Sequence, residues 1–186
     1  MDLSSIGIAP KEFRVIEMHG KRLISDFIAG KFLVLAIECN VRGNYSSPIQ
    51  QRLKAVFPSL FRRFEKRTDK YLGNAVLLDI FIPDLLPRKF FVSHLFLSEH
   101  YGLDKKGKPV SRYSEKHLRD SIEQMLWQLR KEGIDPDRQI AVQRFYGGLG
   151  GVYWETVQAV LDDICEKHKI NIFAYLPKDH DTKIVA

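Results

Sequence analysis

The chain has 186 residues and a mass of 21.6 kDa, and 45% of its residues are apolar, with 12 Phe, 7 Tyr and 2 Trp. This composition can fill the core of one domain and excludes a disordered chain. The formal net charge is +6, and two cysteines, Cys39 and Cys165, are too few for a disulfide framework or a paired metal site.

The sequence shows no signal for secretion or membrane insertion, which favours an intracellular protein. No apolar run is long enough to cross a bilayer, and no basic segment precedes an apolar stretch at the N-terminus. We therefore expect one cytoplasmic domain over residues 1–186, with a core at about 13–176, a polar tail at 177–186 and no membrane partner. The oligomeric state stays open.

The hydrophobic pattern alternates between strands and helices. The first half predicts strands at 13–18 and 32–37, then a helix from Ile49 to Phe64 with a kink at Pro58. Strands follow at 75–82 and 90–97, joined by a turn that contains Pro83 and Pro87. The second half predicts a helix over 118–129, a strand at 139–145, a helix over 154–164 and a strand at 170–176. This order predicts the α/β class, as a three-layer α/β/α sandwich with a mixed central sheet.

The first loop that could carry chemistry, residues 39–50, leaves the most apolar strand. Ser47 can cap a helix, with Pro48 at the first helical position and Gln50 completing a capping box. A helix N-terminus presents unpaired N–H groups and partial positive charge, which suit a phosphate. The alternative is that Ser47 only caps its own helix.

The second loop, residues 144–155, again joins a strand to a helix. It holds Gly147, Gly148, Gly150 and Gly151, whose backbone can approach a ligand closely and form an anion-binding nest. The spacing fits neither the dinucleotide fingerprint nor a P-loop. The alternative is a flexible structural turn.

Two basic stretches leave a further possibility open. Residues 52–70 hold seven Lys or Arg against two acids, and residues 104–120 hold six against three. Such a face favours an anionic partner, including nucleic acid, but it is also typical of a solvated helix surface. Sequence signatures of serine hydrolases, metalloproteases and metal sites are absent, and Cys39 and His94 are more typical of a core.

Four segments together resemble the macro domain, in particular its fungal and phage ADP-ribose-1''-phosphate phosphatase branch. The resemblance covers residues 13–176 in the same order. It rests on Cys39-Asn40-x-x-Gly43-x-Tyr45, Leu72-Gly73-x-x-Val76-Leu77-Leu78, Leu95-Phe96-x-Ser98-x-x-Tyr101-Gly102 and Gly148-Leu149-x-Gly151-Val152-x-Trp154.

The resemblance implies binding of ADP-ribose or a related nucleotide, with possible hydrolysis of a terminal phosphate. The implied activity needs no metal and no organic cofactor, because backbone N–H groups supply the electrostatic stabilisation of the ligand. Asn40 would orient the distal ribose or a water. The implied ligand-binding residues are Cys39, Gly43, Tyr45, Ser46, Ser47, Ser98, Tyr101, Gly147, Gly148, Leu149, Gly150, Gly151 and Tyr153.

The chain also departs from the family pattern. Ser46-Ser47-Pro48 replaces a glycine run, Ile37 stands where some members have His, and Tyr153 stands where many hydrolases have Asp. These departures keep open the alternative of a non-catalytic binding module with an altered pocket. The basic face at residues 52–70 keeps open a third interpretation that is not favoured, a protein that associates with nucleic acid.

Overall fold

The computed structural model describes residues 12–20, 22–99, 113–146 and 152–177. These residues form one six-stranded sheet, in which five neighbouring strands run parallel and the sixth, at one edge, is antiparallel. The mixed sheet expected from the sequence is therefore confirmed. The spatial order is β1 (Val15–His19), β6 (Ile172–Leu176), β5 (Ile140–Gln143), β2 (Val34–Asn40), β4 (Phe90–Ser98) and β3 (Ala75–Ile80).

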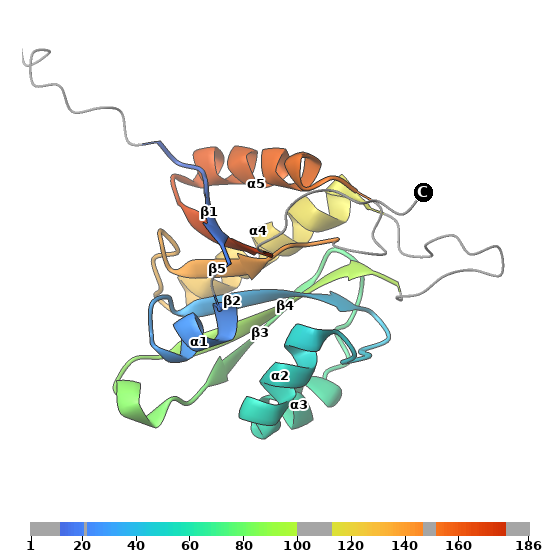
Figure 1. Ribbon diagram of the computed structural model, residues 1–186. Coiled ribbons are helices and arrows are strands. Elements are labelled where there is room, and N and C mark those ends of the chain that lie inside the picture. Colours follow the sequence, from blue (N-terminus) through green and yellow to red (C-terminus); the bar gives the residue numbers. More distant parts are fainter. Residues whose placement is uncertain (1–11, 21, 100–112, 147–151, 178–186) are drawn as a thin grey trace, which may run out of the picture.

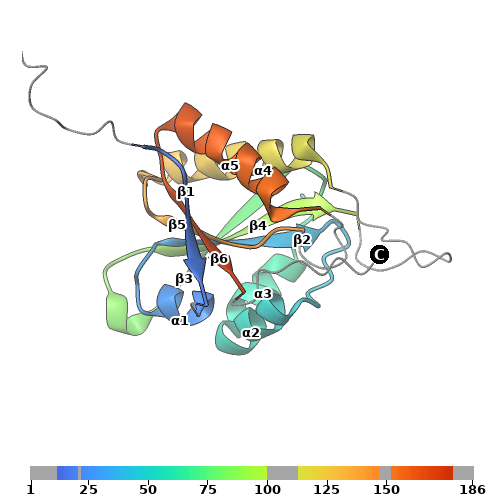
Figure 2. The same ribbon diagram turned by 45° about the horizontal axis from the view of Figure 1, so that its top comes forward.

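Helices cover both faces of the sheet, which completes the three layers (Figure 1). One face carries α4 (Glu115–Lys131) and α5 (Trp154–His168), which lie side by side (Figure 2). The other face carries α1 (Leu23–Ile28), α2 (Pro48–Val56) and α3 (Pro58–Glu65). Strand β2 is buried on both faces because its side chains alternate between two hydrophobic cores.

The predicted kink at Pro58 is a complete break between two helices. Phe57 ends α2 with φ −126° and ψ 70°, outside the helical region. A residue before proline is restricted in this way, and proline itself is favoured at the first position of a helix. Helix α3 therefore begins anew at Pro58. Strand β5 is also shorter than predicted, because only residues 140–143 pair in the sheet.

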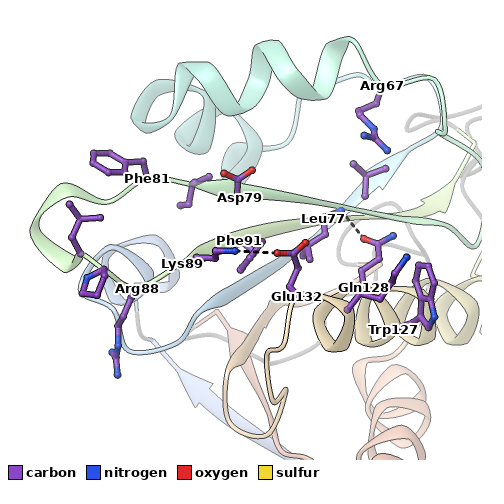
Figure 3. A pocket seen from close by; sticks show the side chains of 15 residues that line it. Arg67, Leu77, Asp79, Phe81, Arg88, Lys89, Phe91, Trp127, Gln128 and Glu132 are labelled. Atoms are coloured by element: carbon purple, nitrogen blue, oxygen red, sulfur yellow. Dashed lines mark hydrogen bonds and ion pairs between the residues drawn. The ribbon is translucent and has the colours of Figure 1, made fainter.

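The outer edge of β3 is covered by side chains. Leu77 N donates to Gln128 Oε1 (3.0 Å), and Gln128 Nε2 donates to Ala75 O (2.8 Å). Further along the strand, Arg63 donates to the backbone oxygen of Asp79 and pairs with its carboxylate. A cavity of about 530 Å³ lies along this edge, and Figure 3 shows Gln128 reaching into it. It is lined by β3, the segment that joins β3 to β4, Phe91 of β4 and the C-terminal end of α4.

The basic stretch at residues 52–70 spans the second half of α2, all of α3 and the residues that follow it. Leu53, Leu60 and Phe64 face the core, and most of the charged side chains lie on the exposed side. Arg67 pairs with Asp69, in addition to the pair that Arg63 makes with β3. Among the described residues, no helix is long and apolar enough to span a membrane.

Candidate functional site

The candidate site lies where β2, β4 and β5 end. These parallel strands have their carboxyl ends at one edge of the sheet, where ligands bind in open α/β folds. Asn40 ends β2 and pairs in register with Ser98, which ends β4, after a bulge between Cys39 and Asn40. Val41 N donates to Ser98 O (3.0 Å), so the two strand ends are tied together.

Asn40 and Ser98 each present a buried polar atom without a partner. Asn40 is fully buried, and its Oδ1 accepts from Asn44 N (3.2 Å). Within the described part of the chain, Asn40 Nδ2 and Ser98 Oγ have no hydrogen-bond partner. Leaving a buried polar group unpaired is unfavourable, so such groups commonly bind ordered water or a ligand. Because Asn40 and Ser98 are register partners on adjacent strands, these two atoms give the site two hydrogen-bonding groups.

Glu38 brings a buried carboxyl to the same strand end. Its side chain is 7% exposed, and Oε2 accepts from the backbone N–H of Tyr146 (2.7 Å). Burial raises the pKa of Glu38 to about 7, although the hydrogen bond from Tyr146 acts in the opposite direction. A carboxyl with this pKa changes charge near neutral pH.

Tyr146 is held from three sides immediately before the glycine-rich segment. Its φ is +53°, a left-handed conformation that is uncommon for a residue with a Cβ. Its hydroxyl donates to Leu97 O (3.3 Å), and its ring packs edge-on against Tyr113 (5.1 Å between centroids). The third contact is the hydrogen bond that the Tyr146 backbone N–H donates to the Glu38 carboxyl. The chain therefore leaves β5 in a fixed direction.

The first loop begins α2 as the sequence predicts. Ser47 Oγ accepts from Gln50 N (3.4 Å), and Gln50 Oε1 accepts from Ser47 N (3.0 Å), which confirms the capping box. Both amides are thus satisfied within the helix, and Pro48 has no N–H to offer. Ser46 is exposed. Gly43 turns the loop with φ +70°, and its N–H donates to Asn40 O (3.0 Å).

The side chains of Tyr45 and Cys39 point into the core under α2 and α3, away from the strand ends. The Tyr45 ring packs against Phe61 and Phe64, and its hydroxyl lies 3.3 Å from His94 Nε2. Cys39 Sγ accepts from Gln50 Nε2 (3.4 Å), and burial raises the pKa of the thiol. The structure therefore does not bring these two side chains to the candidate site.

His94 is a core histidine, as its sequence context suggests. Its Nδ1 lies 3.3 Å from Val76 O, so this nitrogen carries the proton and Nε2 accepts from Tyr45. Burial lowers the pKa of His94 to about 3, so the ring is neutral at pH 7.

Helix α5, which follows the glycine-rich segment in the sequence, begins with no side-chain cap. Tyr153 is its N-cap residue, and its side chain is 57% exposed. Trp154 follows, buried, and its Nε1 donates to Glu17 Oε1 in the middle of β1 (2.8 Å). The predicted site residues Tyr101, Gly147, Gly148, Leu149, Gly150 and Gly151 lie outside the described residues.

Sequence reasoning missed Glu38 and Tyr146. Glu38 does carry a signal, since it is a charged residue directly after the apolar run at 32–37. Its contact with Tyr146 spans 108 positions and has no counterpart in the local pattern. Within the described ranges, no group of three or more His, Cys, Asp or Glu could hold a metal ion.

Comparison with known proteins gives one sequence relative and several structural neighbours. No family model matches the chain. A protein of Lodderomyces elongisporus named ADP-ribose 1''-phosphate phosphatase is 26% identical over 138 residues, which cover 73% of this chain and 82% of the relative.

The structural neighbours share the fold at low sequence identity. The macrodomain of Thermus aquaticus DarG is 15% identical with a TM-score of 0.65, over 88% of this chain and 99% of the neighbour. Thermosipho africanus DarTG, solved in complex with ADP-ribose, is 20% identical with a TM-score of 0.66, over 86% of this chain and 42% of the neighbour. From its sheet, its layers and these structural similarities, the protein has the macrodomain fold.

Proposed function

We propose that this protein binds ADP-ribose or a closely related nucleotide at the carboxyl ends of β2, β4 and β5. The observation that carries the proposal is the pair of buried, unpartnered polar atoms, Asn40 Nδ2 and Ser98 Oγ, in neighbouring register positions. The similarity to a protein named ADP-ribose 1''-phosphate phosphatase, and to a neighbour solved with ADP-ribose, supports this ligand.

In this proposal, Asn40 and Ser98 hydrogen-bond to the distal ribose and its neighbouring phosphate. The backbone amides of residues 147–151 receive the diphosphate, together with the uncapped start of α5. The capping box of Ser47 uses two amides of the first loop, so the second loop contributes more of the anion binding. No metal takes part in binding.

Calorimetric titration with ADP-ribose tests the proposal. Ser98→Ala is the informative variant, because Ser98 Oγ has no partner to lose within the described part of the free protein. Asn40→Ala should lower the affinity by at least about tenfold, or 1.4 kcal/mol. The matched control is Asn44→Ala, whose exposed side chain lies in the same loop. Full affinity in both Asn40→Ala and Ser98→Ala would place the ligand elsewhere.

Hydrolysis of the terminal phosphate of ADP-ribose 1''-phosphate is a second candidate function. The name of the sequence relative favours it, and Glu38 supplies a carboxyl two residues before Asn40. We expect slow phosphate release that depends on Asn40 and is insensitive to chelators. ADP-ribose binding without phosphate release would assign the protein as a non-catalytic binding module. Release that requires an added metal would contradict the proposed mechanism.

A further inference from the structure

Glu38 is a buried acidic side chain at the candidate site, and its environment is unusual. Within the described residues it forms no ion pair, and its hydrogen bond comes from the Tyr146 backbone. An ionised carboxylate only accepts hydrogen bonds. A protonated carboxyl keeps an oxygen that can accept from the same N–H and gains an O–H donor. The hydrogen bond from Tyr146 can therefore persist in both protonation states of Glu38, whereas the negative charge is lost on protonation.

The charge of Glu38 lies close to any anion bound at Asn40. Alternate residues of a strand point to the same face and lie about 7 Å apart. Cys39, between them, points into the opposite core, which is consistent with this alternation. An anion that accepts a hydrogen bond from Asn40 thus lies within roughly 10 Å of the Glu38 carboxyl. At that separation near a protein surface, repulsion weakens binding by roughly tenfold per unit charge.

We propose that Glu38 is a positioning residue that also couples ligand binding to proton uptake: its carboxyl holds the Tyr146 amide, and an anionic ligand binds as Glu38 takes up one proton from solvent. This inference rests on the proposed function, because it requires an anionic ligand such as ADP-ribose. The proton neutralises the repelling charge without removing the acceptor for Tyr146. Glu38 thereby makes the affinity of the site depend on pH.

Glu38 changes its charge near neutral pH, whereas four other titratable groups in this part of the fold stay uncharged. Burial holds the pKa of its carboxyl at about 7. Burial raises the pKa of the Cys39 thiol on the same strand and of the Tyr146 and Tyr113 phenols, so these groups are uncharged at pH 7. The pKa of the His94 ring, on the opposite face, is about 3, so it also stays neutral.

Calorimetry with ADP-ribose from pH 6.0 to 8.5, in two buffers with different heats of ionisation, measures both affinity and proton uptake. A diphosphate diester keeps its charge over this range, whereas a terminal phosphomonoester titrates near pH 6. Wild-type protein should bind about tenfold more tightly at pH 6.0 than at pH 8.5, with net proton uptake. Glu38→Gln keeps an acceptor without the charge, so its affinity should be independent of pH and exceed that of the wild type at pH 8.5. Glu38→Leu lacks the acceptor and should bind weakly at every pH.

The outcomes separate this inference from the proposed function. Wild-type binding that is independent of pH, with no proton uptake, overturns the coupling while the proposed function stands. Equal weakness of the Gln and Leu variants overturns the positioning role. No wild-type binding at any pH refutes the proposed function and the coupling with it. The amide resonance of Tyr146 then tests the positioning directly, because it should titrate near pH 7 in the free wild type and not in Glu38→Gln.

Discussion

Replacement of Glu38 by Gln should change how the stability of the folded protein depends on pH. The pKa of this carboxyl rises from 4.5 to about 7 on folding, because burial disfavours the charged form. The folded state therefore binds more protons than the unfolded state between these values, and stability falls as pH rises through this window. A rise in the pKa of Glu38 from 4.5 to about 7 corresponds to about 3 kcal/mol of stability.

Guanidinium unfolding at pH 5.0, 7.0 and 8.5 measures the effect. The Gln variant lacks the charge, so it should gain about 2–3 kcal/mol relative to wild type between pH 5.0 and pH 8.5. Any loss from imperfect packing of the amide is the same at each pH and cancels in this comparison. Replacement of the exposed Glu166 by Gln is the matched control and should show almost no such change. A constant difference between wild type and Glu38→Gln at all three pH values would refute the reasoning.

Three further expectations follow from the local geometry. Gly43→Ala should lower the unfolding free energy by about 1–2 kcal/mol, because φ is +70° there, and an unchanged denaturation midpoint would contradict the turn geometry. Ser47→Ala removes a helix cap and should cost about 1 kcal/mol, whereas Ser46→Ala, at the exposed neighbour, should be neutral in the same assay. Cys39 and Cys165 are both buried, so neither should react with a thiol reagent in native protein at pH 8, although both should react after unfolding. Rapid labelling of the native protein would contradict this burial.

The elements that the sequence predicted well are those whose pattern is local. The apolar run at 32–37 lies within the central part of the sheet, and the capping box at Ser47 forms as expected, because each depends on a few consecutive residues. The sequence predicted one helix with a kink at Pro58, but the structure has two helices that separate at Phe57. A proline can either kink a helix or start a new one. Packing against the rest of the fold decides between these outcomes, and this packing cannot be predicted from the local sequence.

The candidate site was predicted only in part, because it depends on contacts across the fold. The sequence placed Asn40 and Ser98 just after two predicted strands, and the fold makes these strands neighbours, so the two residues are register partners. The family resemblance implies that Tyr45 binds the ligand, but its ring turns into the aromatic cluster around Phe64. A loop tyrosine can face a ligand or the core, and only the position of α3 decides this. The partnership of Glu38 with the backbone of a distant residue follows no sequence pattern.

The covering of β3 by Gln128 has a consequence for self-association. An exposed edge strand is a template on which another molecule can add a strand and begin to aggregate. The Gln128 carboxamide occupies one donor and one acceptor of that template, and Arg63 occupies an acceptor further along. Both protecting side chains belong to helices and not to the sheet. Resistance to edge-to-edge aggregation therefore depends on helix docking, and partial detachment of α4 would free the two groups on β3 that Gln128 covers.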